Sequence, residues 1–127
     1  ALVVDDSIAG DVPGVDEKRA PLKVGRGPGI TIMDSGFIVS ESVKELLISA
    51  AEEDYIPYQL EVLRGGTTDA ASIRTTKTGV PVGVLSVPVR YGHSSVEVVD
   101  LQDMVNTVRL VISVLSRLDA KKIEEIR

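Results

Sequence analysis

Short apolar runs and longer amphipathic runs alternate along this chain. Residues 1–8, ALVVDDSI, predict a short buried strand that ends in two carboxylates. Segments 22–34 and 56–63 predict further strands, with one or two short ones in the first of them. Segment 80–89, VPVGVLSVPV, is nearly all apolar, which favours a strand that is covered on both faces.

The amphipathic runs predict helices between and after these strands. Residues 40–54 place apolar side chains at helical spacing, and residues 64–79 contain a turn followed by a short helix. A closing helix is expected to begin at Asp100 and to turn one apolar face toward the core. The residues expected on that face are Leu101, Met104, Val105, Val108, Val111, Ile112, Leu115 and Leu118.

The alternation of strands and helices predicts an α/β fold with a mostly parallel central sheet flanked by helices. In such sheets, ligands bind beyond the carboxyl ends of the strands. Polar residues stand where three of the predicted strands end: Asp5 and Asp6, the segment 64–69 (RGGTTD), and the segment 90–94 (RYGHS). We therefore expect these three segments to meet at one site.

Composition narrows the classes of protein that fit this fold. The 127 residues suffice for one domain, and 43% apolar with 26% charged residues is typical of a globular protein. A net charge of −5 without a basic cluster argues against nucleic acid as a partner. The absence of cysteine excludes disulfides and thiolate metal sites. No apolar run approaches the length of a membrane span, so a cytoplasmic location is expected. The chain opens on strand-like residues without a methionine, which indicates a piece of a larger protein.

Several chemistries fit these strand ends poorly. A serine hydrolase needs a nucleophile on a sharp turn, and no G-x-S-x-G stretch exists here. Ser94 and Ser95 are too close to His93 in sequence to pair with it as nucleophiles. The glycine-rich segments 25–29 and 64–69 lack the full phosphate-binding patterns, and tight turns explain them more simply.

A metal site fits the strand ends better, although a polar histidine without a ligand role stays an alternative. Imidazole and carboxylate are suitable ligands for zinc, cobalt or manganese. Asp5 and His93, the only histidine, lie 88 positions apart, so only the fold can bring them together. A two-metal hydrolytic centre needs about five or six ligands. Either there is no such centre, or the other ligands lie outside this chain.

Several segments together resemble one enzyme family. These segments are VVDDSIAGDVPG, KVGRGPGI, IPYQLEVLRGGTTDA and GVPVGVLSVPVRYGHSSVEVVD, followed by the closing helix. In this order they are similar to the C-terminal half of the catalytic domain of the tetrahedral-type dinuclear metallo-aminopeptidases. This family is also labelled deblocking or glutamyl aminopeptidase, and some members carry the label endoglucanase. The resemblance implies a zinc-exopeptidase, phosphorylase/hydrolase-like architecture that is incomplete in this chain.

The resemblance implies metal ligands at two positions of this chain. Asp5 matches the aspartate that binds one metal ion, and His93 matches a ligand of the second. Asp6 stands where the family usually has an uncharged residue, so an exchange of roles between Asp5 and Asp6 stays open. The frame set by the following residues, IAGDVPG, favours Asp5.

The resemblance also implies substrate contacts and an incomplete site. Ile8, Gly65, Gly66 and Thr67 match positions that line the substrate pocket. The remaining metal ligands and the glutamate general base match no residue here, so no catalytic residue is expected in residues 1–127. An N-terminal part and a small inserted domain are expected elsewhere in the complete protein.

The implied function is the metal-dependent removal of N-terminal residues from peptides. It would use two divalent ions, zinc or cobalt, in a dimer-based homo-oligomer such as a dodecamer, with neither nucleic acid nor a membrane as a partner. Two alternatives stay open. The first is a metal-free α/β binding or scaffold module, and the second is a glycoside hydrolase, which would need two opposed carboxylic acids and no metal.

Overall fold

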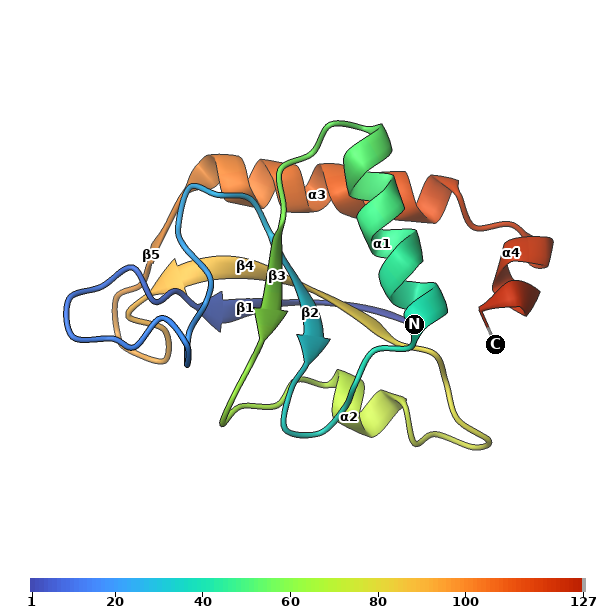
Figure 1. Ribbon diagram of the computed structural model, residues 1–127, viewed down its shortest axis with the longest axis horizontal. Coiled ribbons are helices and arrows are strands. Elements are labelled where there is room, and N and C mark those ends of the chain that lie inside the picture. Colours follow the sequence, from blue (N-terminus) through green and yellow to red (C-terminus); the bar gives the residue numbers. More distant parts are fainter. Residues whose placement is uncertain (127) are drawn as a thin grey trace.

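A strongly twisted sheet forms the centre of the molecule, with helices packed against it (Figure 1). The computed structural model describes residues 1–126. Its strands are β1 (Leu2–Ile8), β2 (Gly29–Met33), β3 (Gln59–Val62), β4 (Gly83–Arg90) and β5 (Val98–Val99). Its helices are α1 (Glu41–Glu53), α2 (Ala70–Ile73), α3 (Leu101–Ser116) and α4 (Ala120–Glu125). The expected α/β class is confirmed, while β5 and α4 were not predicted.

The sheet has the strand order β1-β4-β2-β3, and β5 pairs with β4. Most of the pairing is parallel, in the long β1–β4 ladder and in the β2–β3 ladder. The two parallel pairs are joined by a short antiparallel contact between β2 and β4. Because the pairs cross steeply, the carboxyl ends of β1 and β3 converge at one corner of the molecule (Figure 1).

Helix α1 covers one face of this sheet and forms the main core. Its buried residues Val43, Leu46, Leu47, Ala50 and Ala51 pack with Ile30 and Leu85 of the sheet. At Gly83 on β4, a Cβ atom would lie 3.0 Å from side-chain atoms of both Leu47 and Val43. The absence of a side chain there lets the helix approach the strand closely.

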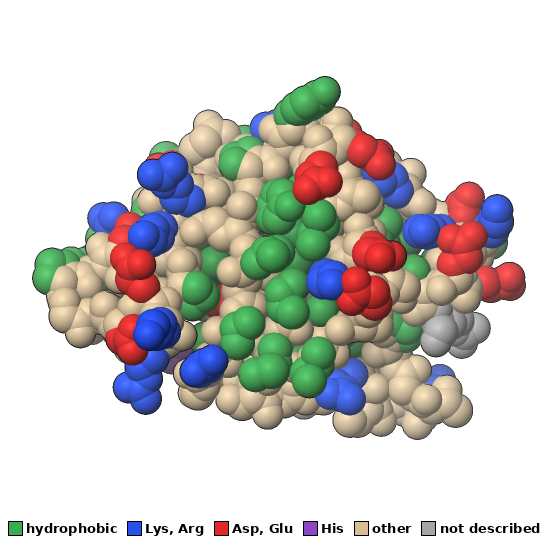
Figure 2. All heavy atoms as spheres, viewed as in Figure 1, with side chains coloured by type: hydrophobic (Ala, Val, Ile, Leu, Met, Phe, Trp, Pro, Cys, Tyr) green, Lys and Arg blue, Asp and Glu red, His purple; other side chains and the backbone are tan. Residues whose placement is uncertain are grey.

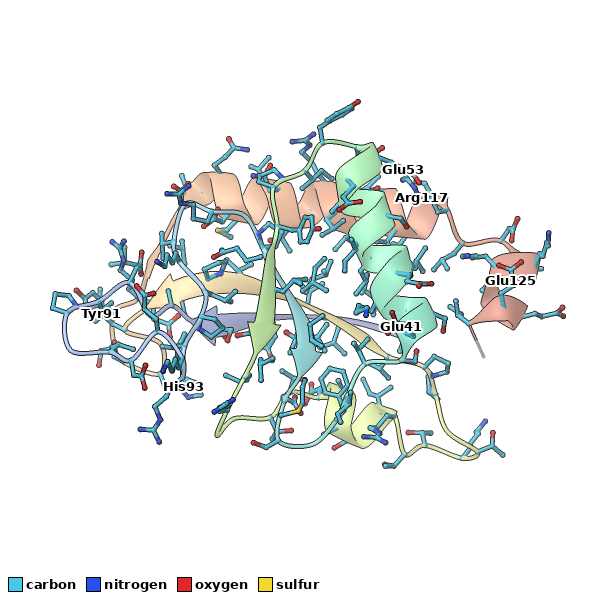
Figure 3. The ribbon with its side chains drawn as sticks, in the orientation of Figure 1. Glu41, Glu53, Tyr91, His93, Arg117 and Glu125 are labelled. Carbon is cyan, nitrogen blue, oxygen red and sulfur yellow. The ribbon has the colours of Figure 1, made fainter. Side chains whose placement is uncertain are left out.

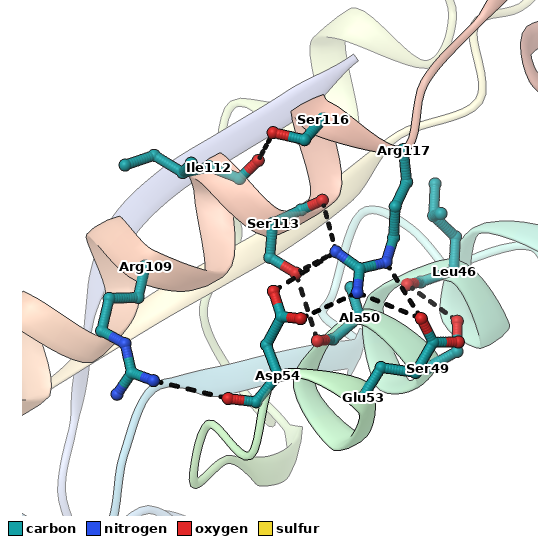
Figure 4. A network of polar contacts seen from close by, with 10 residues as sticks. All are labelled: Leu46, Ser49, Ala50, Glu53, Asp54, Arg109, Ile112, Ser113, Ser116 and Arg117. Atoms are coloured by element: carbon teal, nitrogen blue, oxygen red, sulfur yellow. Dashed lines mark hydrogen bonds and ion pairs between the residues drawn. The ribbon is translucent and has the colours of Figure 1, made fainter.

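Polar contacts join α1 to α3 (Figure 4). The Ser113 hydroxyl of α3 donates to the Ala50 carbonyl at 3.2 Å. The Arg117 guanidinium donates to Glu53 at 3.0 Å and to Asp54 at 2.9 Å. The hydrogen bond from Arg117 lowers the pKa of Asp54, and the contacts together hold the C-terminal ends of α1 and α3 to each other.

The predicted orientation of α3 is wrong for most of its apolar residues. Of the eight expected core residues, six are between 45% and 74% exposed, and Val111 and Leu118 are half-buried. We refer to the six, Leu101, Met104, Val105, Val108, Ile112 and Leu115, as the α3 apolar stripe. The opposite face is buried instead, and it carries Asp103, Asn106, Thr107, Leu110, Ser113 and Val114.

Hydrogen bonds explain why a polar face of α3 lies inside. The buried Asp103 carboxylate accepts from the backbone N–H of Gly25 at 2.6 Å and of Gly27 at 2.8 Å. The Thr107 hydroxyl donates to the Asp103 carbonyl within the helix. Polar groups are usually buried only when they are hydrogen-bonded. Here Asp103 provides the acceptor for two backbone N–H groups of the glycine-rich loop before β2.

Apolar side chains also reach the surface over β2 and β3. Figure 2 shows them as a green band between groups of acidic and basic side chains. The exposed apolar residues of this part of the chain include Ile38, Tyr55, Leu60 and Val62. None of the helices within residues 1–126 combines the length and apolarity that crossing a lipid bilayer requires.

Candidate metal and substrate site

One cavity of about 480 Å³ lies where β1, β3 and the loop after β4 converge. Its lining contains the three polar segments that the sequence analysis expected to meet. The lining residues are Asp5, Asp6, Ser7, Ile8, Arg19, Ala20, Leu63, Arg64, Gly65, Gly66, Thr67, Thr68 and His93. The fold thus brings Asp5 and His93 to one cavity, together with Ile8 and the turn 65–67.

Asp5 and Asp6 lie inside β1 rather than after it. Consecutive residues of a strand point to opposite faces, so the two carboxylates diverge. The Asp5 carboxylate accepts from the backbone N–H of Asp6 at 2.9 Å, which orients one of its oxygens. The Asp6 carboxylate lies on the side of Gly92, where a Cβ atom would be 3.8 Å from its Oδ2. Both carboxylates are therefore candidates for a ligand near His93.

His93 lies in a tight loop between β4 and β5 (Figure 3). Its backbone is in the left-handed region with φ 64°, as is that of Tyr91 with φ 63°. The backbone N–H of His93 donates to the Glu97 carboxylate at 2.8 Å. The side chain is exposed, and its backbone is held in a conformation that non-glycine residues adopt seldom and that histidine tolerates comparatively well.

An ion pair ties the segment after β1 to the end of β4. The Arg90 guanidinium donates to both oxygens of Asp11, at 3.0 and 2.6 Å. The hydrogen bond from Arg90 lowers the pKa of Asp11, and the Val24 N–H also donates to this carboxylate. Because Arg90 stands three residues before His93, this pair limits how far the two loops can separate.

A buried carboxylate on β3 connects the four main strands, and one of its partners, Ser7, lines the cavity. Glu61 of β3 is 1% exposed. It accepts from the hydroxyls of Ser7 on β1, Thr31 on β2 and Ser86 on β4. The sequence analysis missed this cluster, because a single glutamate in a strand pattern gives no signal of the hydroxyls that face it from distant segments.

The loop after β3 borders the cavity opposite β1. Gly65 has φ 95°, which an L side chain rarely adopts, so the turn requires glycine there. At Gly66, a Cβ atom would lie 3.0 Å from the Leu63 side chain. The Gly66 carbonyl accepts from the Ser35 N–H at 2.9 Å, and the N–H and hydroxyl of Thr68 donate to Asp34. The turn is thus fixed to the segment after β2.

The donor set at the cavity suits part of a metal site. Imidazole and carboxylate oxygens are zinc and cobalt ligands, and Asp5, Asp6 and His93 all border the same space. Within residues 1–126, however, no group of three or more His, Cys, Asp or Glu side chains is arranged to hold a metal ion. These residues therefore fit as a share of a ligand set that other residues would complete.

The comparisons with known proteins place the chain in a family. Residues 1–110 match the model of the family described as M42 glutamyl aminopeptidase. This match covers most of the chain, so the chain belongs to the M42 family of aminopeptidases. The resemblance stated from the sequence is confirmed.

Individual relatives agree in fold and sequence. The structure of a TET aminopeptidase from a marine sediment thaumarchaeote has a TM-score of 0.97 at 40% identity, covering 100% of this chain and 35% of that one. Pyrococcus horikoshii TET1 peptidase, described as assembling into a tetrahedron or a large octahedral shell, has a TM-score of 0.74 at 28% identity, covering 92% and 33%.

A curated relative, the lysyl aminopeptidase of Pyrococcus furiosus, is 34% identical over 104 residues, which are 81% of this chain and 29% of the relative. The chain spans about a third of the length of the relatives it matches.

Proposed function

We propose that the complete protein is a metal-dependent aminopeptidase and that residues 1–127 are the C-terminal part of its catalytic domain. The observation that carries this proposal is the cavity that unites Asp5, His93 and the turn 65–67 in a chain of the M42 family. The N-terminal part of the domain and a small inserted domain would lie in the rest of the protein.

In this proposal the residues of the chain have two roles. Asp5 and His93 hold divalent cations, zinc or cobalt, and each contributes to a different one of two ions. When bound, such cations supply Lewis-acid polarisation of a peptide carbonyl and make a water molecule more acidic. Ile8, Gly65, Gly66 and Thr67 border the substrate, and the two glycines let it approach the backbone closely. The general base lies outside this chain.

The α3 apolar stripe supports the proposal that this chain is one part of a larger catalytic domain. An exposed row of six large apolar side chains on one helix is typical of a surface that another segment covers. We infer that the N-terminal part of the same catalytic domain packs on it. The opposite face of α3 is buried within this chain, where Asp103 accepts from the loop before β2 and Ser113 donates to Ala50 of α1. The stripe is therefore the exposed side of the helix.

The proposal extends to partners. Peptides with a free N-terminus are the proposed substrates. A homo-oligomer, dimer-based and as large as a dodecamer, is proposed because the related TET1 peptidase is described as assembling into a tetrahedron or a large octahedral shell, and a similar PhTET1 structure is described as a dodecamer. The cytoplasmic location stays a prediction from the sequence.

Removal of metal tests the proposed function directly. We expect the full-length protein to hydrolyse aminoacyl-p-nitroanilides, to lose this activity after dialysis against EDTA, and to regain it with zinc or cobalt. A metal-independent hydrolysis of β-glucan would instead support the glycosidase alternative. If the protein hydrolyses neither substrate with any added metal ion, the result would support the alternative of a metal-free binding or scaffold module.

The choice between the adjacent carboxylates is tested by paired variants of the full-length protein. We expect Asp5→Asn to weaken metal binding by more than about a hundredfold, because it removes a direct ligand. Asp6→Asn should weaken it less, by no more than about ten- to a hundredfold, as for a group that acts from outside the ligand set. Metal content after dialysis against a graded chelator measures both. A larger loss in Asp6→Asn would assign the ligand to Asp6.

A further inference from the structure

Asp34, directly after β2, is a buried carboxylate that the proposed chemistry does not use. It is 3% exposed and does not border the cavity. Its Oδ1 accepts from the N–H groups of Gly36 at 2.6 Å and Phe37 at 2.9 Å. Its Oδ2 accepts from Thr68, from the N–H at 2.8 Å and from the hydroxyl at 3.0 Å. Each oxygen thus serves a different segment.

The two segments that share Asp34 are the turn 34–37 after β2 and the turn 65–68 after β3. They touch at further points. The Ser35 N–H donates to the Gly66 carbonyl, and the Leu63 N–H donates to the Met33 carbonyl, both at 2.9 Å. A Cβ atom on Gly36 would collide with the Ala71 Cβ and lie 2.8 Å from the Thr67 Oγ1. The contact is therefore close as well as hydrogen-bonded.

The donors that Asp34 accepts from require both of its oxygens to be acceptors. An asparagine of the same shape offers one oxygen and one N–H₂ group. Its nitrogen would face either the two backbone N–H groups of Gly36 and Phe37 or the backbone N–H of Thr68, and only the Thr68 hydroxyl could turn to accept from it. Either the turn 65–68 would lose its hydrogen bond to residue 34, or the turn 34–37 would lose its two. Buried donors left without an acceptor are costly, so the change acts on the geometry of one turn or the other.

We propose that Asp34 is a positioning residue for substrate binding, which holds the turn 65–68 to the turn 34–37 after β2, in the conformation that receives the substrate. This inference rests on the proposed function, because it assigns a binding role to Gly65, Gly66 and Thr67. Asp34 touches neither Asp5 nor His93 in the hydrogen bonds of residues 1–126, so its effect is on substrate affinity rather than on metal.

The test is steady-state kinetics of the zinc-loaded full-length protein with an aminoacyl-p-nitroanilide. We expect Asp34→Asn to raise KM about tenfold, the effect of one buried hydrogen-bond defect, with kcat changed by less than about twofold. Metal content should equal that of the wild type. Asp16→Asn is the matched control, since Asp16 is exposed and outside the cavity, and its carboxylate accepts from the nearby backbone N–H of Lys18. It should leave KM unchanged.

A second variant disturbs the contact between the turns 34–37 and 65–68 without changing Asp34. Gly36→Ala keeps the Asp34 carboxylate and forces the turns apart through Ala71 and Thr67. It should also raise KM, and it replaces Asp34→Asn in the test if that variant does not fold. An unchanged KM in a folded variant, or a loss confined to kcat or to metal content, would overturn the positioning role. Absence of turnover in the wild type would instead refute the proposed function.

Discussion

Replacing His93 with alanine in the full-length protein should abolish nearly all peptidase turnover and remove about one equivalent of metal, because a catalytic ion ordinarily has about three protein ligands and cannot spare one. His93 borders the cavity with Asp5 and is the only histidine of the chain. Inductively coupled plasma analysis of dialysed protein measures the metal, and aminoacyl-p-nitroanilide hydrolysis measures the turnover.

Tyr91→Ala provides the matched control for this experiment. Tyr91 lies in the same loop, has the same left-handed backbone with φ 63°, and does not border the cavity. It therefore reports the effect of an alanine at a strained position without the loss of an imidazole. Full metal content and activity in His93→Ala would remove His93 from the ligand set and leave it a polar loop residue.

The second large effect concerns residues 1–127 produced alone. We expect no aminopeptidase turnover from this chain, weak zinc binding, and self-association. In the proposed site, Asp5 and His93 would give about one ligand to each of two ions, against about three in an ordinary catalytic zinc site. Within residues 1–126, no larger ligand group is arranged to compensate. The α3 apolar stripe would be open to solvent and to other copies.

Calorimetric titration with zinc and analytical ultracentrifugation measure these properties. Val108→Lys with Ile112→Lys should reduce self-association, because both residues belong to the stripe and are more than half exposed. The same charges on the opposite, buried side would disrupt folding, so the stripe offers the cleaner comparison. Tight binding of two metal ions per chain with peptidase activity would show that the chain is a complete enzyme.

The sequence predicted the parts of the fold that depend on local pattern. The strands, the helix at 40–54 and the start of α3 after Asp100 are confirmed, since apolar periodicity and a capping carboxylate are local signals. The meeting of Asp5, His93 and the turn 65–67 also followed, because polar residues at strand ends converge. The antiparallel β2–β4 contact was not expected, as no local pattern encodes the direction of a neighbouring strand.

The wrong orientation predicted for α3 and the two buried carboxylates that were missed share one physical cause. Periodicity identifies the apolar face of a helix, but it does not say whether that face lies against this chain or against another segment. In α3 the apolar face is exposed, and Asp103 is buried because glycine N–H groups from a distant loop need an acceptor. Asp34 and Glu61 were missed for the same reason, since their donors come from segments far along the chain.

The pairing of β1 with β4 has a consequence for how the molecule forms. Leu2 pairs with Gly83 and Ile8 with Val89, so the ladder that holds Asp5 closes a loop of most of the chain. Contacts between residues so distant in sequence slow folding, because the entropy of a long loop is lost before the ladder compensates for it. The helices and the β2–β3 pair can form early, whereas Asp5 reaches the neighbourhood of His93 only when β1 docks. If Asp5 and His93 bind metal as proposed, this binding would be a late event that waits for β1 to pair with β4.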